Sequence, residues 1–220
     1  MRRTLPRRLH SSWLGLGLGL GLGAALAAAG PARADELAGS ALVSALRHGG
    51  YVLVLRHASS PFEAPDKSTA EPDNPTLERQ LDAAGKETAT EMGKAIKALG
   101  IPIGEVDSSQ TFRAFQTAKY ADLPRPKPVA ELTEGKQGMS ADADKSRAAW
   151  LTQAAASAPR AGTNTVLITH TPNMLAAFGE KAKDIKAGEA MVFQPDGKGG
   201  TSLVARVTID EWPRLAATQR

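Results

Sequence analysis

Cysteine is absent from the 220 residues of the sequence. Its absence excludes disulfide bonds, thiolate nucleophiles, cysteine-ligated zinc and the lipid anchor of a bacterial lipoprotein. Histidine is scarce, with four copies, and no two of them have the short helical spacing of a zinc site. The sequence also lacks the G-x-S-x-G elbow of serine hydrolases, and Gly197-Lys198 lacks the flanking residues of a Walker A loop. We therefore expect neither a metal ion nor another cofactor.

Acidic residues are missing from the first 34 positions, which hold five arginines. The whole chain has a net charge of +4, but without these arginines 22 basic residues stand against 23 acidic ones. The rest of the chain is close to neutral and has no general attraction to a phosphate backbone. We expect no nucleic-acid partner. A hydrophobic content of 42% with 23% charged residues is typical of a globular protein.

Residues 1–34 have the three parts of a secretory signal peptide. Four arginines lie within 1–10, an uncharged run of Leu, Gly and Ala covers 11–29, and Ala32-Arg33-Ala34 forms a small-residue end. The apolar run is short for a membrane span and diluted by glycine, so we expect cleavage after Ala34 and no stable membrane anchor. Arg2-Arg3 also fits twin-arginine export, which leaves that route and the Sec route open. The sequence predicts a periplasmic protein with one domain, residues 35–220.

Strands and helices are predicted to alternate along this domain. The continuous apolar run at 51–55 is typical of a strand buried on both faces, and 165–169, with Val-Leu-Ile at its centre, is predicted to be a second buried strand. The order of elements predicts a three-layer α/β/α sandwich with a mostly parallel central sheet, and the proline-rich segment 59–75 is expected to be a surface loop. The predicted helices are 36–47, 82–99, 111–121, 141–156 and 173–178, and the predicted strands are 51–55, 104–107, 128–130, 165–169, 189–193 and 202–209.

Polar residues follow three of the predicted strands. Arg56 and His57 come directly after 51–55, and His170 follows 165–169. Ser108 and Ser109 follow 104–107, and Arg113 lies in the first turn of the next helix. Serine hydroxyls, helix-start N–H groups and an arginine together suit a phosphate group. Because ligands of such sheets bind beyond the carboxyl ends of the strands, we expect these residues to meet in one site.

With four sequence elements in the family's order, the chain resembles branch 1 of the histidine phosphatase superfamily, which has the phosphoglycerate-mutase-like fold. The match covers about residues 51–209. The four elements are Leu55-Arg56-His57-Ala58, Leu81-Asp82-x-x-Gly85, Ser108-Ser109 with Arg113 and Gln116-Thr117-Ala118, and Thr169-His170-x-x-Asn173.

The resemblance implies phosphoryl transfer in two steps. His57 would be the nucleophile and become phosphohistidine, while Arg56, Arg113 and His170 would hold the phosphate oxygens. The family takes its general acid from a Leu-x-Glu setting after the second motif, and Leu132-Thr133-Glu134 fits it. Glu134 is therefore the expected acid. Four other carboxylates stay open as alternatives: Glu131, Glu63, Asp142 and Asp144.

The expected function is a periplasmic phosphomonoesterase whose partner is a small phosphate ester. The export signal argues against a mutase of cytoplasmic metabolism. Two alternatives stay open: a non-catalytic protein that binds phosphate or a phosphosugar in the same pocket, and a phosphatase of phosphohistidine proteins.

Overall fold

The computed structural model describes residues 36–61, 78–135 and 140–219, and the following concerns these residues. The predicted N-terminal signal segment and Glu63 lie outside them. Short 3-10 helices, η1 (Ala130–Leu132) and η2 (Gly179–Ala182), accompany the main elements. The helices are α1 (Gly39–His48), α2 (Ala83–Ala98), α3 (Phe112–Tyr120), α4 (Ala141–Ala155), α5 (Thr171–Phe178) and α6 (Glu211–Thr218), and the strands are β1 (Val52–Arg56), β2 (Ile103–Ser108), β3 (Lys127–Pro128), β4 (Asn164–Thr169), β5 (Ala190–Pro195) and β6 (Thr201–Val207).

The six strands form one sheet in the order β3-β2-β4-β1-β5-β6. Neighbours from β3 to β1 pair in parallel, whereas β5 is antiparallel to both β1 and β6. β5 therefore runs against the other five strands. The sheet is mostly parallel, as predicted, but mixed rather than purely parallel.

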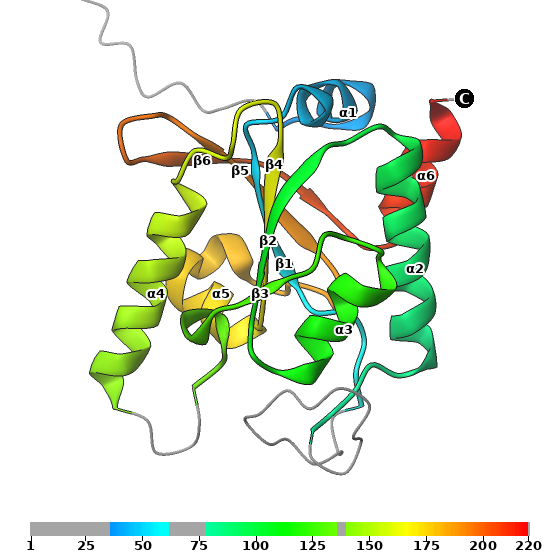
Figure 1. The fold of residues 1–220 in the computed structure, drawn as a ribbon. Coiled ribbons are helices and arrows are strands. Elements are labelled where there is room, and N and C mark those ends of the chain that lie inside the picture. Colours follow the sequence, from blue (N-terminus) through cyan, green and yellow to red (C-terminus); the bar gives the residue numbers. More distant parts are fainter. Residues whose placement is uncertain (1–35, 62–77, 136–139, 220) are drawn as a thin grey trace, which may run out of the picture. The chain divides into compact units, whose positions relative to one another are not determined.

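Helices cover both faces of the sheet (Figure 1). Alternate residues of β1 point to opposite faces, so Leu53 and Leu55 join one hydrophobic cluster and Val52 and Val54 join the other. The first cluster packs under α1, α2, α3 and α6, and the second under α4, α5 and η2. This is the three-layer arrangement that the alternating elements predict.

Two regions differ from the prediction. The strand expected at 128–130 covers only Lys127–Pro128, because Val129 caps η1, which begins at Ala130. After β6 the chain forms α6, which was not predicted. Its buried Trp212 is 1% exposed and belongs to the larger hydrophobic cluster. This short helix packs against α2.

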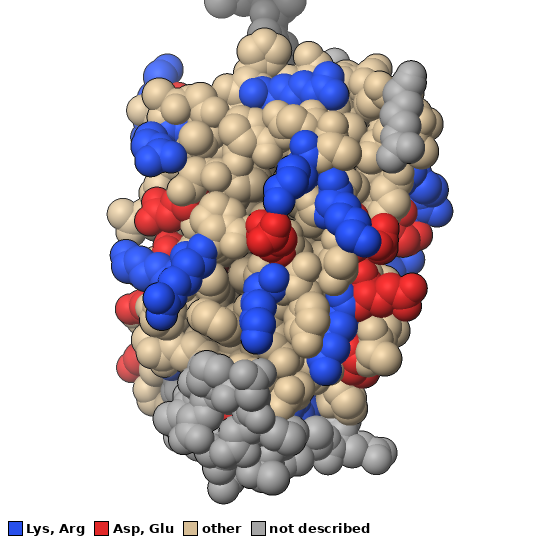
Figure 2. Space-filling model, turned by 45° about the vertical axis from the view of Figure 1, so that its right-hand side comes forward, with Lys and Arg blue, Asp and Glu red and all other residues tan. Residues whose placement is uncertain are grey.

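Basic and acidic side chains are interspersed on the face that carries α2 and α6 (Figure 2). Ion pairs connect some of them, such as Lys94 with Glu91 at 2.8 Å and Lys97 with Asp122 at 2.7 Å. Within the described residues, no helix has the length and apolar character needed to cross a membrane.

Candidate active site

The predicted site residues lie at the carboxyl ends of three neighbouring parallel strands, β1, β4 and β2. Arg56 lies opposite Thr169 in the pairing of β1 with β4, and Ser108 lies opposite Ile168 in the pairing of β2 with β4. The next residue of each strand, His57, His170 or Ser109, therefore emerges at the same level. All three side chains are at least nine-tenths buried.

His57 presents its Nε2 atom to the site. Its Nδ1 lies 2.7 Å from the carbonyl oxygen of Ala58, and because a carbonyl can only accept, Nδ1 carries the proton. Nε2 then has a free lone pair and accepts a hydrogen bond from Nε of Arg113 at 3.2 Å. The neutral imidazole is thus held in the tautomer that a nucleophile attacking through Nε2 requires.

His170 directs its Nδ1 atom toward Arg113. Nδ1 of His170 lies 3.3 Å from a terminal nitrogen of Arg113, which can only donate, so Nδ1 is the acceptor. Nε2 then carries the proton and donates to Oγ of Ser109 at 2.8 Å. The rings of His57 and His170 meet edge to face, with centroids 5.1 Å apart.

Burial holds both histidines in the neutral form. It lowers the pKa of His57 to about 3, and the charge of Arg113 adds to this effect. Burial also lowers the pKa of His170 well below its ordinary value, and electrostatic interactions with His57 and Arg113 lower it further. Desolvation disfavours the charged imidazolium, and the surrounding arginines repel it.

Arg113 is the centre of the group. Its side chain is fully buried in the first turn of α3 and contacts His57, His170 and the carboxylate of Glu134. Thr117, one turn later, connects this helix to the segment that carries His57. Its hydroxyl donates to the Arg113 carbonyl at 2.8 Å and accepts from the backbone N–H of Ala58 at 3.0 Å.

Arg56 borders the same group from the end of β1. It donates to the carbonyl of Ile185 at 2.8 Å, and its Nε is buried with no hydrogen-bond partner among the described residues. Burial lowers the pKa of Arg56, and the neighbouring charge of Arg79 lowers it further. A buried guanidinium with an unused donor is suited to receive an anion.

Arg79 belongs to the site although the sequence analysis did not select it. It lies 3.9 Å from Glu134, and its charge lowers the pKa of both His57 and His170. Contacts with α3 position its segment: Glu78 accepts from the N–H of Phe112, and Leu81 donates to Gln116 at 2.8 Å. A signal was present, since Arg79 lies two residues before the Leu81-Asp82-x-x-Gly85 element.

The Leu81-Asp82-x-x-Gly85 element has a structural role. Asp82 caps α2 by accepting from the N–H of Gly85 at 2.6 Å, and it also accepts from the hydroxyl of Ser59 at 2.7 Å. A Cβ atom on Gly85 would lie 2.1 Å from the backbone oxygen of Ser59. Glycine is therefore required for the chain after His57 to approach α2 this closely.

Glu134 reaches the group from the segment after η1. Its side chain is 26% exposed, pairs with Arg113 and lies 3.9 Å from Nδ1 of His170. Asn173 holds this segment in place, because its Nδ2 donates to the carbonyls of Glu131 at 3.1 Å and Thr133 at 3.2 Å. The carboxylate thus lies at the rim of the cradle formed by the arginines and histidines.

The other candidate acids lie elsewhere or outside the described residues. Glu131 contributes only its backbone carbonyl to the contacts named above. Asp142 is 94% exposed on the first turn of α4. Asp144 lines a cavity between α4 and α5. Among the candidate acids that the structure describes, Glu134 is the one in contact with Arg113. In the described part of the chain, no three residues among His, Asp and Glu are grouped so that they could hold a metal ion.

Comparison with known proteins finds the fold but no close relative in sequence. No family model and no curated protein matches the chain. A solved structure of the protein histidine phosphatase SixA with tungstate matches with a TM-score of 0.51 and 18% identity, covering 73% of this chain and 98% of that one. Phosphoserine phosphatase from Entamoeba histolytica with 3-phosphoglyceric acid matches with a TM-score of 0.51 and 13% identity, covering 72% and 96%. The resemblance to histidine phosphatases is thereby confirmed at the level of the fold.

Proposed function

We propose that this protein is a phosphomonoesterase that works through a phosphohistidine on His57. The observation that carries the proposal is the orientation of His57. Its Nδ1 is committed to a backbone carbonyl, and its Nε2 lone pair faces the buried guanidinium of Arg113. A phosphate group bound by Arg113 would lie directly against the nitrogen that attacks it.

In the first step, Nε2 of His57 forms a bond to phosphorus while the bond from phosphorus to the ester oxygen breaks. Arg56, Arg79 and Arg113 would stabilise the negative charge on the transferring group. Arginine suits this task because its charge does not depend on pH in the working range. For His170 to hold a phosphate oxygen as well, its Nδ1 must gain a proton, and the negative charge of the phosphate favours that protonation.

The leaving oxygen needs a proton, and we assign its delivery to Glu134. A phosphate group competes with this carboxylate for Arg113, so binding would release Glu134 toward the leaving group at the rim. In the second step, water attacks phosphorus, the bond to Nε2 breaks, and Glu134 takes the proton of the water. The cycle closes with inorganic phosphate as the product and with both residues restored.

The direct test is hydrolysis of an aryl phosphate by the chain 35–220, with rapid quenching during turnover. We expect an acid-labile, base-stable phosphoryl adduct on the wild type, and none on His57→Ala, which should also lose activity. Full activity in His57→Ala would refute the mechanism. Phosphate binding without any hydrolysis would instead support the non-catalytic binding protein.

A phosphatase of phosphohistidine proteins is the second candidate. The similarity that favours it is the match to SixA, of which almost the whole chain is covered. Release of phosphate from a phosphohistidine protein faster than from small esters would support this candidate.

We further propose that the protein works in the periplasm, because its N-terminal 34 residues have the pattern of a secretory signal. N-terminal sequencing of the exported protein should begin at or near Asp35. Protein that begins at Met1 would contradict export with cleavage.

A further inference from the structure

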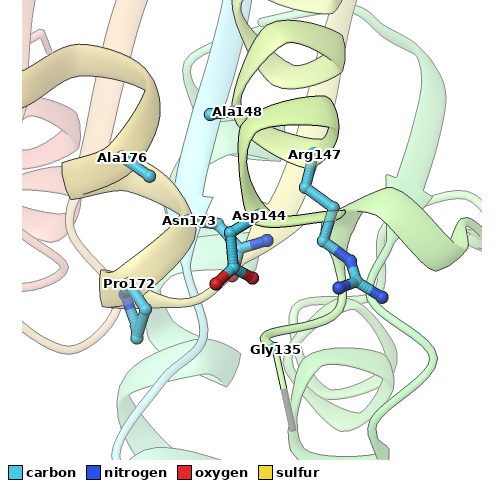
Figure 3. A pocket seen from close by; sticks show the side chains of 7 residues that line it. All are labelled: Gly135, Asp144, Arg147, Ala148, Pro172, Asn173 and Ala176. Carbon is cyan, nitrogen blue, oxygen red and sulfur yellow. The ribbon is translucent and has the colours of Figure 1, made fainter. Parts of the chain in front are cut away.

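A cavity of about 290 Å³ lies between α4 and α5, beside the segment that carries Glu134 (Figure 3). Its wall includes Gly135, the residue after Glu134, and Asn173, which holds the Glu134 segment. If Glu134 protonates the leaving group, as proposed above, that group lies beside Glu134 and therefore close to this cavity. The lining residues are Gly135, Asp144, Arg147, Ala148, Pro172, Asn173 and Ala176.

Asn173 offers this cavity an acceptor without a partner. The residue is 5% exposed, and its Nδ2 is used by the two carbonyls of the Glu134 segment. Its Oδ1 has no hydrogen-bond partner among the described residues. A buried polar atom without a partner costs free energy, which a ligand that donates a hydrogen bond would recover.

Asp144 adds a second acceptor in the same wall. Figure 3 shows its carboxylate directed from α4 toward Asn173 at the start of α5. Ala148, Pro172 and Ala176 give the wall small apolar surfaces, and Arg147 of α4 places a guanidinium group in it as well. The two acceptors therefore lie beside surfaces that suit a short carbon chain, in a space near the lower end of the size range of small-molecule pockets.

We propose that this cavity binds the leaving group of the substrate and selects esters whose leaving group carries a hydrogen-bond donor. This proposal rests on the phosphomonoesterase function. The donor is a hydroxyl or an ammonium group, which Asn173 and Asp144 accept. A leaving group without a donor leaves the buried Oδ1 of Asn173 unpaired, whereas water still reaches the exposed Asp144, and a site with an unpaired buried acceptor discriminates against such analogues.

The test uses three esters of nearly equal size: aminoethyl, hydroxyethyl and propyl phosphate. For the wild type, we expect kcat/KM on the first two to exceed that on propyl phosphate by about tenfold or more, the range of a hydrogen bond to a charged acceptor. Asp144→Ala should remove most of this preference. Asp144→Asn keeps an acceptor but loses the charge, so it separates the two donors. It should lower turnover of aminoethyl phosphate and spare hydroxyethyl phosphate.

Asp142→Asn is the matched control, because Asp142 and Asp144 are both exposed aspartates in the first turn of α4, but only Asp144 lines the cavity. It should leave the preference unchanged. Equal kcat/KM on all three esters in the wild type would overturn the proposal, and so would an equal loss in Asp142→Asn and Asp144→Asn.

Failure of the cavity proposal is distinguishable from failure of the phosphatase function. Hydrolysis of propyl and aryl phosphates without a preference for donors leaves the phosphatase intact and removes the selection. If no ester is hydrolysed, calorimetric binding of aminoethyl and propyl phosphate to the wild type tests the cavity alone. Tighter binding of aminoethyl phosphate that Asp144→Ala abolishes supports the cavity, and equal affinities overturn it.

Discussion

Two arginine–glutamate pairs lie at the same end of the sheet. In one pair the arginine is the buried partner, and in the other the glutamate is. In the pair Arg113–Glu134, the arginine is 0% exposed and the carboxylate 26%. In the pair Arg206–Glu189, the carboxylate is 4% exposed and the arginine 29%. The first pair lies in the candidate active site, and the second joins β6 to the segment before β5.

In the second pair, both side chains make further hydrogen bonds to the backbone. Arg206 contacts Glu189 at 2.6 Å and also donates to the carbonyls of Lys181 and Lys183. Glu189 accepts in addition from the N–H of Lys186 at 2.8 Å. These oxygen acceptors belong to the protein, so the pair closes the segment between η2 and β5.

A bound phosphate could replace some of the partners of Arg113. Two of its contacts are neutral histidine nitrogens, and its carboxylate partner reaches solvent. Phosphate oxygens are stronger acceptors for a guanidinium than neutral imidazole nitrogens are. The comparison shows that the same two residue types can stabilise a fold or await a ligand, depending on what else surrounds the arginine.

The largest expected effect follows from removal of the Arg113 charge. Arg113→Met should lower kcat/KM for an aryl phosphate about 1000-fold, near the upper end of the loss typical for a key oxyanion donor. Phosphate affinity should fall as well, because the arginine contacts phosphate in the ground state too. Steady-state kinetics and calorimetry measure both. A loss below tenfold would show that Arg113 resembles Arg206 and is structural.

Substitution of the exposed partner should have an effect that depends on the substrate. Glu134→Gln should lower kcat on alkyl phosphates about 100-fold, because the poor leaving group loses its proton donor. Aryl phosphates need little protonation, so their kcat should change less than about threefold. Glu131→Gln is the control and should leave both unchanged. Equal losses on both substrate types would remove Glu134 from the acid role.

Removal of the arginine from the second pair should affect stability more than activity. Arg206→Met leaves the buried carboxylate of Glu189 without its partner and should lower the free energy of unfolding by about 2 kcal/mol, less than for a fully buried pair because solvent reaches Arg206. Urea unfolding measures the loss. The double variant with Glu189→Met should recover part of it, since no unpaired charge is left. A loss of activity as large as in Arg113→Met would erase the contrast between the pairs.

The smallest effect concerns the neutral histidine beside Arg113. The pKa of His57 is lowered to about 3, so below about pH 6.5 the unfolded chain takes up a proton that the folded chain does not. Stability therefore falls as the pH falls, by about 1 kcal/mol between pH 7 and 5.5 for one such histidine. His57→Gln should remove this contribution, as measured by urea unfolding at both pH values. His48→Gln, a change of an exposed histidine, should leave the pH dependence as in the wild type.

The fold was predictable because its signals are local. The apolar run at 51–55 and the Val-Leu-Ile centre of 165–169 identify buried strands without knowledge of the rest of the chain, and the structure confirms both as β1 and β4. Their parallel pairing then places His57 and His170 side by side. α6 escaped prediction because its helical role depends on where Trp212 packs. Arg79 was missed for a similar reason, since a loop arginine is identified as a site residue only by its neighbours in space.

The sequence by itself determined which residues stand at the strand ends, because strand, turn and helix signals act over a few neighbouring positions. Tertiary structure decided what those residues face. Arg113 meets His57 across 56 positions of the chain and Glu134 across 21. The tautomers of His57 and His170 follow from donors and acceptors that only folding brings within reach. The neutral state of both histidines follows from burial, a property of the assembled layers rather than of any segment.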